Sequence, residues 1–335
     1  MKKWICILSI LFFAKKAWAQ DPHFSQFFSS PLTLNPASTG NFNGIARISA
    51  NYRNQWPALG KAFVTSTVAI DGGLLKKYTP FNDQFSGGII LLSDQTGNGI
   101  LKENHMGVSL AYQKGLDEDG IHSIAVGFQA SLTNLLFDAG KANFEDELTV
   151  SGFSLPSAEL FLGRDLGKKF YDFHVGLLYQ GPLGDEGMFY IGTSIYHLNK
   201  PKLGFSSNNY FIRNRYNLHG GGFISAGAST TLHVSGQYQN HFNYKEWVVG
   251  AALSKNLKNL PRQYKEVYAG VWMRNKDALI PYLGFEWNDV RIGFSQDINM
   301  SGSRTSANSY QSTEVSFIWI INKNKSPYNK KCPKF

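Results

Sequence analysis

The sequence predicts an all-β protein whose strands close into a transmembrane antiparallel barrel of about fourteen strands. Three observations predict this fold. Apolar and polar residues alternate in many short segments, aromatic residues make up 14% of the chain, and no internal apolar run is long. A membrane helix needs roughly 18 consecutive apolar residues. Successive side chains of a strand point to opposite faces, so each alternating segment has one apolar face and one polar or small face.

The alternation is clearest in residues 170–180, where one face holds Asp172, His174 and Gln180 and the other holds apolar residues. The same pattern recurs along the whole chain after residue 44. About fourteen segments follow it: near 45–53, 62–71, 84–93, 104–113, 121–131, 170–180, 187–197, 214–225, 229–240, 244–254, 264–274, 277–287, 289–299 and 311–321.

A soluble β-sandwich or barrel would also alternate, with its apolar face turned inward. A membrane barrel has the inverse arrangement, with apolar residues facing lipid and polar or small residues inside. Glycines on the polar faces and aromatics near segment ends favour the membrane barrel. Closure also removes every unpaired strand edge from the lipid. The aromatics expected at the membrane interfaces are Tyr171, Tyr179, Trp272 and Trp287.

The N-terminus predicts export. Residues 1–19 combine a positive start at Lys2 and Lys3, a ten-residue apolar run and an Ala-Trp-Ala site. This combination is typical of a signal peptide cleaved before Gln20. Ten apolar residues are too few for a membrane anchor. Without the four lysines of this segment the net charge falls from +9 to +5, and there is no arginine-rich run, so we expect no nucleic-acid partner.

No linker divides the rest of the chain, and we expect one barrel domain over residues 44–322. Residues 20–43 precede the first strand. They form either a periplasmic hook, a plug inside the barrel, or a chain held extended by its Ser-Pro and Asn-Pro steps. Residues 323–335 form a basic tail, either a solvated end or a handle for a partner. Its Cys332 is the single cysteine of the exported chain, so no internal disulfide forms.

Three motifs add a resemblance. Residues 20–28 lead into Pro-Leu-Thr-Leu-Asn-Pro-Ala at 31–37, and Asn-Tyr-Arg-Asn-Gln-Trp-Pro follows at 51–57. Together they resemble the PorP/SprF family of Bacteroidetes, outer-membrane proteins associated with the type IX secretion system. Residues 190–201 and the terminal Cys-Pro-Lys-Phe at 332–335 are similar to family motifs too, although the family more often has Arg before the final Phe. The resemblance covers essentially the whole exported length.

This resemblance implies a fatty-acid-transporter-like barrel in the outer membrane and a non-enzymatic role in the secretion and gliding apparatus. The implied partners are secretion-system proteins of the periplasmic ring or its lipoproteins, or a large surface adhesin that the barrel anchors or helps to export, besides the surrounding lipid. The family establishes no catalytic residues. The candidate motif and partner-contact residues are Asn35, Pro36, Asn51, Arg53, Gln55, Trp56, Pro57, His197 and Cys332.

Residue spacing predicts no metal or cofactor site. The eight histidines are scattered without i, i+4 pairs, and there is neither a Cys-x-x-Cys motif nor a G-x-S-x-G motif. A Ser/His/acid hydrolase stays open, because such sites are recognised by geometry and not by order. A channel for small hydrophobic solutes is the main alternative function, and it rests on the barrel class alone. Arg53 lies on the polar face of its strand, where we expect it to pair with an acid such as Glu286 or Asp297.

Overall fold

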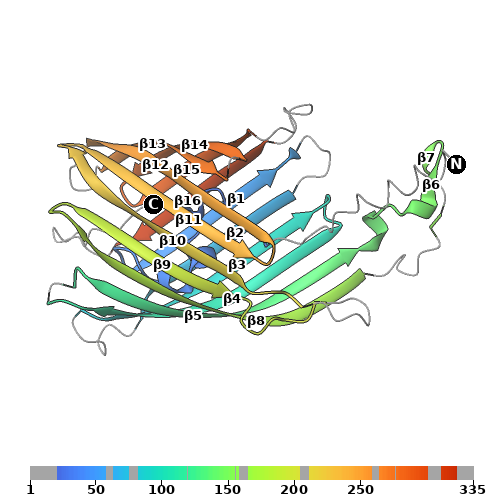
Figure 1. Cartoon of the computed structure of the whole chain (residues 1–335), viewed down its shortest axis with the longest axis horizontal. Helices are drawn as coiled ribbons and strands as arrows, with labels where there is room; N and C mark the ends of the chain where they lie inside the picture. The colour runs from blue at the N-terminus through green and yellow to red at the C-terminus, as the bar shows by residue number, and fades with distance from the viewer. Residues whose placement is uncertain are drawn as a thin grey trace.

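The computed structural model confirms a closed antiparallel barrel. In its described residues, fourteen strands form one ring in which β1 pairs with both β2 and β16 (Figure 1). All fourteen predicted segments are strands of this ring. The described residues are 21–57, 63–74, 82–118, 120–154, 156–157, 165–203, 211–258, 264–275, 277–300 and 311–322. The predicted signal peptide and the basic tail with Cys332 lie outside them.

The strands of the ring contain between 10 and 19 residues, which is long enough to cross a bilayer at a tilt. Their bounds are β1 Ala46–Gln55, β2 Phe63–Leu74, β3 Gln84–Thr96, β4 Leu101–Gly115, β5 Ser123–Asp138, β8 Asp165–Leu183, β9 Gly187–Tyr196, β10 Arg215–Gly227, β11 Thr230–His241, β12 Tyr244–Lys258, β13 Lys265–Arg274, β14 Ala278–Trp287, β15 Val290–Asn299 and β16 Ser312–Ile321.

The wall of the barrel has an apolar outside and a polar inside. On β4, Val108, Leu110 and Tyr112 are exposed on the outer face, whereas Ser109 and Ala111 between them are buried. A soluble barrel would show the opposite arrangement. Because bulk water would penalise so large an apolar surface, its natural solvent is lipid. The structure therefore supports the membrane barrel over the soluble alternative.

Membrane interfaces favour aromatic residues on the outer surface near the ends of a barrel. Exposed Tyr171 and Trp287 fit the predicted girdle. The prediction for Trp272 is wrong: this side chain is 1% exposed and lies inside the barrel, where its indole N–H donates to Ser235 Oγ at 3.1 Å. The reason is strand parity, since Trp272 shares a face of β13 with the buried Tyr268.

The connections differ between the two ends. The longer ones, 139–164, 197–214 and 300–311, all lie at the end where β5, β9 and β15 finish, which we call the loop end. The short hairpin of β6, Leu148–Thr149, and β7, Gly152–Phe153, projects beyond the barrel there (Figure 1). The opposite, turn end holds the first residue of β1 and the last of β16. Bacterial membrane barrels keep short turns in the periplasm, so we expect the loop end to face outward.

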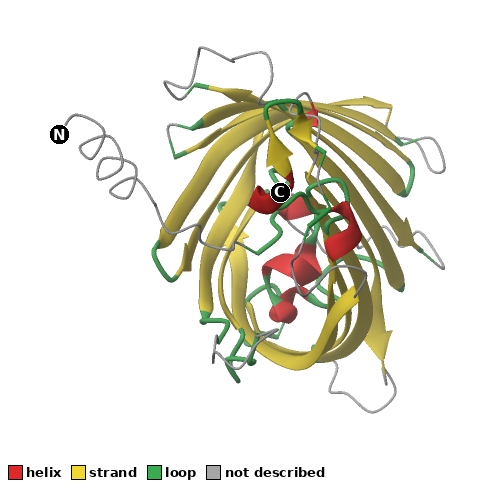
Figure 2. Cartoon of the chain, turned by 90° about the vertical axis from the view of Figure 1, so that its right-hand side faces the viewer, coloured by secondary structure: helices red, strands yellow, loops and turns green. Residues whose placement is uncertain are grey.

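Helical turns are few and short. Within the described part of the chain, no helix is both long and apolar enough to cross a membrane. Three short helices precede β1, namely η1 Phe27–Ser29, α2 Pro31–Leu34 and η2 Pro36–Ser38. The view along the barrel shows these turns inside the ring of strands (Figure 2).

We expect Val108→Arg to lower the free energy of unfolding by about 2–4 kcal/mol, because it places a cation near the middle of the lipid-facing surface. Val150→Arg is the matched control, since Val150 is fully exposed in the β6–β7 hairpin outside the barrel. The measurement is urea unfolding of protein folded into vesicles, followed by the gel mobility of unheated samples. Equal stability of the two variants would contradict a lipid-facing Val108.

Candidate functional site: the N-terminal segment in the barrel lumen

Residues 21–43, which we call the lumen segment, lie inside the barrel and run along its length (Figure 2). Near the loop end, the Ser25 hydroxyl donates to Asp297 of β15 at 2.7 Å. Near the turn end, the Gly40 N–H donates to Asp71 of β2 at 2.7 Å. Of the three interpretations of this segment, the plug also places it inside the barrel; that it acts as a plug stays a prediction.

The lumen segment has no strand partner: its short helical turns satisfy part of its backbone, and wall side chains bond further groups. Ser194 Oγ of β9 donates to the Leu34 carbonyl at 2.7 Å, and Tyr196 of the same strand donates to the Leu32 carbonyl at 3.1 Å. Prolines begin the second and third short helices, where a missing N–H costs nothing. Each turn of the segment is thus fixed by the polar inner face of the barrel.

Asn35 is the central anchor of the segment and is fully buried. Its Oδ1 accepts the N–H of Ala37 at 2.8 Å and so caps the helix that follows. Its Nδ2 donates to the carbonyl of Leu177 on β8 at 2.9 Å and to that of Thr193 on β9 at 3.3 Å, and lies 3.0 Å from Nε2 of His219 on β10. One amide therefore joins the segment to three strands.

Glycines in the wall make room for this anchor. A Cβ added to Gly176 of β8 would lie 1.8 Å from Asn35 Oδ1, and one added to Gly127 of β5 would lie 2.2 Å from the Ala37 nitrogen. Both distances are far below van der Waals contact, so only glycine allows the backbone to approach this closely. The glycines predicted for the inner face of these two strands thus have a specific structural role.

A buried ion cluster holds the beginning of the segment. Asp297 Oδ2 lies 3.0 Å from Arg53 Nη2 of β1 and 2.8 Å from Arg274 Nη1 of β13. Arg53 also donates to the His23 carbonyl at 2.6 Å, and Arg274 donates to the Ser25 hydroxyl. Two guanidinium groups surround one carboxylate, and each also bonds the lumen segment. These ion pairs and hydrogen bonds offset the cost of burying the charges in low dielectric.

The predicted pairing of Arg53 with Asp297 is confirmed. The other candidate acid, Glu286, instead pairs with Arg291 at 3.0 Å. Glu314 of β16 completes this side of the lumen by accepting the backbone N–H groups of Ser25 at 2.7 Å and of the next residue at 3.1 Å.

A second cluster surrounds His197, which follows β9. Its Nδ1 is hydrogen-bonded to Asp172 of β8, and its Nε2 lies 2.7 Å from Asp21 Oδ2. Arg215 Nε of β10 lies 3.3 Å from the same oxygen. Burial alone would lower the pKa of His197, but the two carboxylates raise it to about 10. Burial likewise opposes ionisation of Asp21, yet His197 and Arg215 hold its pKa well below the usual range.

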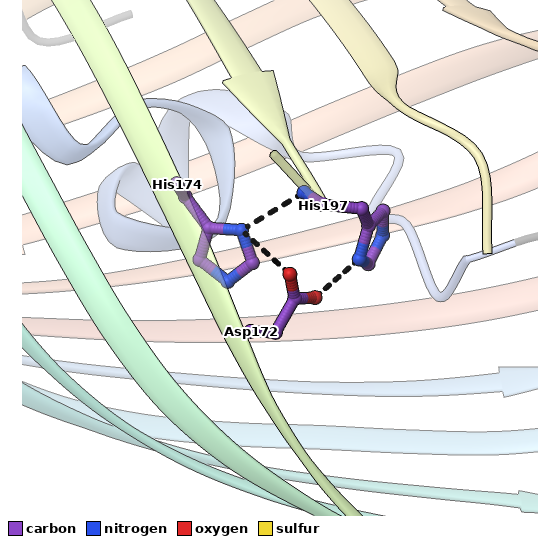
Figure 3. A group of neighbouring side chains, drawn as sticks. All are labelled: Asp172, His174 and His197. Atoms are coloured by element: carbon purple, nitrogen blue, oxygen red, sulfur yellow. Dashed lines mark hydrogen bonds and ion pairs between the residues drawn. The ribbon is translucent and has the colours of Figure 1, made fainter. Parts of the chain in front are cut away.

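The fold also brings His174 into this cluster. The ligand atoms of Asp172, His174 and His197 lie within 4.8 Å of one another, the only such group of metal-binding type among the described residues. Figure 3 shows the three side chains pointing toward one another. Spacing in the sequence did not reveal this convergence, because the chain leaves β8, returns along β9 and only then presents His197.

The predicted motif residues prove to be mostly lumen contacts. Asn35, Pro36 and Arg53 are buried against or within the lumen segment, and the Asn51 amide donates to the Ser29 carbonyl at 3.1 Å. His197 binds Asp21, as described above. The last three residues of the second motif lie at the loop end. Half-buried Gln55 is the last residue of β1, Trp56 follows it with a left-handed backbone at φ of 56°, and Pro57 is exposed. Direct contact of any of them with a partner stays a prediction.

We expect Gly176→Ala to lower the free energy of unfolding by about 1–3 kcal/mol, because Asn35 must leave its buried hydrogen-bond partners. Gly140→Ala is the matched control: it has an ordinary φ and its added Cβ would meet nothing closer than 3.5 Å. Urea unfolding gives the stability, and protease cleavage within residues 21–43, mapped by mass spectrometry, reports release of the segment. Unchanged cleavage in Gly176→Ala would contradict the anchor role.

Comparison with solved structures finds barrels of similar size. The toluene transporter TodX of Pseudomonas putida matches at 9% identity and a TM-score of 0.47, over 89% of this chain and 93% of that one. A FadL homologue of Pseudomonas aeruginosa matches at 9% identity and 0.43, over 85% and 92%. The KdgM porin matches at 10% and 0.41, over 82% and 99%. No curated protein sequence matches.

The family comparison is more informative. The sequence model of the family described as "Type IX secretion system membrane protein PorP/SprF" matches residues 17–319, which is nearly the whole chain. The match includes the lumen segment and every strand of the ring except the last two residues of β16. The chain therefore belongs to the PorP/SprF family of type IX secretion system membrane proteins.

Proposed function

We propose that this protein is a non-enzymatic scaffold in the outer membrane that binds another component of the type IX secretion and gliding apparatus. The partner is a ring component, a lipoprotein or a surface adhesin that the barrel anchors or helps to export. The observation that carries the proposal is the lumen segment, which is bonded to the wall around nearly the whole barrel. A barrel filled in this way acts through its ends and not through a pore.

The contacts of the segment oppose transport. A typical net hydrogen bond contributes about 0.5–1.5 kcal/mol, and bonds to charged groups contribute more. Opening a path along the lumen requires many of them to break together. Wall groups that bond the segment come from ten strands: Arg53 of β1, Asp71 of β2, Gln84 of β3, Ser109 of β4, the Leu177 carbonyl of β8, Ser194 of β9, Asn217 of β10, Arg274 of β13, Asp297 of β15 and Glu314 of β16.

The apolar clusters among the described residues of the barrel interior each contain a residue of the lumen segment, which counts against the channel alternative. The largest apolar cluster inside the barrel includes Trp272 and Tyr282, and the lumen segment fills it with Phe27 and Phe28. The remaining lumen contacts described above are polar or charged. A small hydrophobic solute would have to replace these polar contacts without restoring their hydrogen bonds, which is unfavourable.

The tautomer of His174 argues against a hydrolase. Ser131 Oγ lies 3.1 Å from His174 Nε2, and Asp172 Oδ1 lies 3.9 Å from His174 Nδ1, which resembles a catalytic triad. However, the backbone N–H of His197 donates to His174 Nδ1 at 3.3 Å. The imidazole proton is therefore on Nε2, where it is donated to Ser131, so His174 cannot accept the serine proton. This tautomer supports a non-enzymatic role.

The loop end, which we expect to face outward, offers a surface for a partner on the cell surface such as the adhesin. The β6–β7 hairpin carries exposed Leu148, Val150 and Phe153 beyond the barrel, next to an acidic turn at 145–147. Clustered apolar side chains that face water are typical of protein-binding sites. Exposed Pro57 of the second motif lies at the same end.

We expect the full-length protein to be electrically silent in planar bilayers, because the lumen segment occupies the pore. A variant that lacks residues 22–38 should show discrete conductance steps, since it keeps the strands and loses the filling. The measurement is single-channel recording at matched insertion levels. Equal conductance of the two proteins would support the channel alternative.

We also expect Val150→Glu to reduce partner recovery roughly tenfold, the scale of one interface anchor, because a carboxylate would disrupt apolar contact. Affinity purification from solubilised outer membrane, quantified by mass spectrometry, measures recovery. Leu116→Glu is the control, since Leu116 is an exposed apolar residue in the turn between β4 and β5, at the opposite end. Recovery of the barrel alone from wild-type cells would contradict the scaffold function.

A further inference from the structure

We propose that Asp172, His174 and His197 form a binding site for one divalent transition-metal ion of the zinc class inside the barrel. Two of the ligands alternate along the inner face of β8, and the third follows the end of β9 (Figure 3). Their ligand atoms lie within 4.8 Å of one another, a spacing that metal–ligand bonds of about 2.0–2.2 Å bridge with small side-chain rotations.

The backbone places His197 for this purpose. The paired register of β8 and β9 ends with Val175 opposite Ile195, so His197 lies beyond the ladder. Its φ of 59° is in the left-handed region, which non-glycine residues rarely adopt. This conformation turns the chain so that the imidazole of His197 faces Asp172 and its own N–H reaches His174 Nδ1 at 3.3 Å.

His174 presents the correct nitrogen. It is 1% exposed, and its Nε2–H is donated to Ser131 Oγ, whose own hydroxyl is directed to the Asp172 carbonyl at 3.4 Å. The lone pair of Nδ1 now accepts the His197 N–H at 3.3 Å, a long hydrogen bond that a bound metal ion would replace. Metal-binding histidines characteristically have the far ring nitrogen held in this way by an outer partner, which fixes both the tautomer and the ring orientation.

His197 has the same arrangement with a stronger partner. Its Nε2 is bonded to Asp21 at 2.7 Å, while Nδ1 faces Asp172. A carboxylate behind the far nitrogen of a ligand histidine is the commonest outer-shell partner in zinc sites. Binding of one metal ion would release one proton, the one that His197 Nδ1 now shares with Asp172; the other proton would stay on Nε2 and be donated to Asp21.

The charges around the site also suit a cation. Asp172 and Asp21 supply two carboxylates, and Glu103 of β4 interacts electrostatically with both of them and with His197. Arg215 is an opposing charge, and it contacts Asp21 Oδ2, the oxygen that also bonds His197 Nε2. Two imidazoles and one carboxylate favour zinc, cobalt, nickel or copper over the oxygen-binding calcium and magnesium.

The site would join three parts of the fold. The ligands connect β8 to the chain after β9. Asp21, the first described residue of the lumen segment, bonds the metal-binding His197. A bound ion would therefore strengthen the attachment of that segment near the loop end.

The test uses the full-length protein without a histidine tag, stripped of metal by chelators in detergent and titrated with Co²⁺ alone. We expect one equivalent to bind, with the visible absorption of Co²⁺ at low coordination number. Asp172→Asn and His197→Gln should each abolish this signal. Asp21→Asn should weaken binding about 10–100-fold, as loss of an outer-shell carboxylate does.

His233→Gln is the matched control, because His233 is also buried in the lumen and bonds Ser254 at 3.1 Å, but lies outside the cluster. It should bind Co²⁺ as the wild type does. Gel mobility of unheated samples verifies that each barrel is folded, and the isosteric Asp172→Asn and Asp21→Asn variants keep the test valid if His197→Gln fails to fold. Failure of folded wild type to bind one equivalent, or equal binding by His197→Gln and His233→Gln, would overturn the proposal and leave His197 as a cation between two carboxylates.

Discussion

Closure of the ring at β1 and β16 is the constraint on which the other features depend. Ten residue pairs, from Ala46 opposite Ile321 to Gln55 opposite Ser312, remove the last unpaired edge from the lipid. Once the ring is closed, every second side chain faces an interior that lipid does not reach. The Ile45 N–H donates to the Ile321 carbonyl at 2.8 Å, so the lumen segment meets the ring at its closing seam. Closure therefore fixes both the polar interior and the place from which the segment enters it.

The barrel interior then has to supply hydrogen-bond partners for the lumen segment, which pairs with no strand. Strands pair with strands, but the short helical turns of residues 21–43 satisfy only part of their backbone, and wall side chains bond further N–H and carbonyl groups. Asn35 solves this locally by acting as a cap for Ala37 and as a donor to two strand carbonyls. Gly127 and Gly176 allow the approach that these bonds need. The segment is thus held mainly by amide and hydroxyl groups, and its charged residues lie among its first few positions.

The strand pattern in the sequence predicted most of the fold, because the two-residue period is a local property. The fourteen strands and the pairing of Arg53 with Asp297 both follow from which face a residue occupies. Trp272 shows the limit of composition: its residue type indicated an interface, but its parity with Tyr268 placed it inside. The cluster of Asp21, Asp172 and His197 could not be predicted, because its members meet only after two strands pair and the lumen segment folds between them. The end of the barrel at which the long loops lie likewise could not be predicted, because it depends on the complete order of the strands.

The two ion clusters bear on how the protein works. Removing one partner from a buried ion pair costs about 3–5 kcal/mol. Expelling the lumen segment would remove Asp21 from its ion pairs with His197 and Arg215. It would also break the hydrogen bonds that the segment makes to Asp297 and Arg53, and those of Asn35. Protein partners of micromolar to nanomolar affinity supply about 8–12 kcal/mol in total. If a partner had to open the lumen, the cost of breaking these contacts would cancel most of its binding free energy. A partner that binds the hairpin and loops of an undisturbed barrel has no such cost. The energetics therefore favour a barrel that stays closed while it binds.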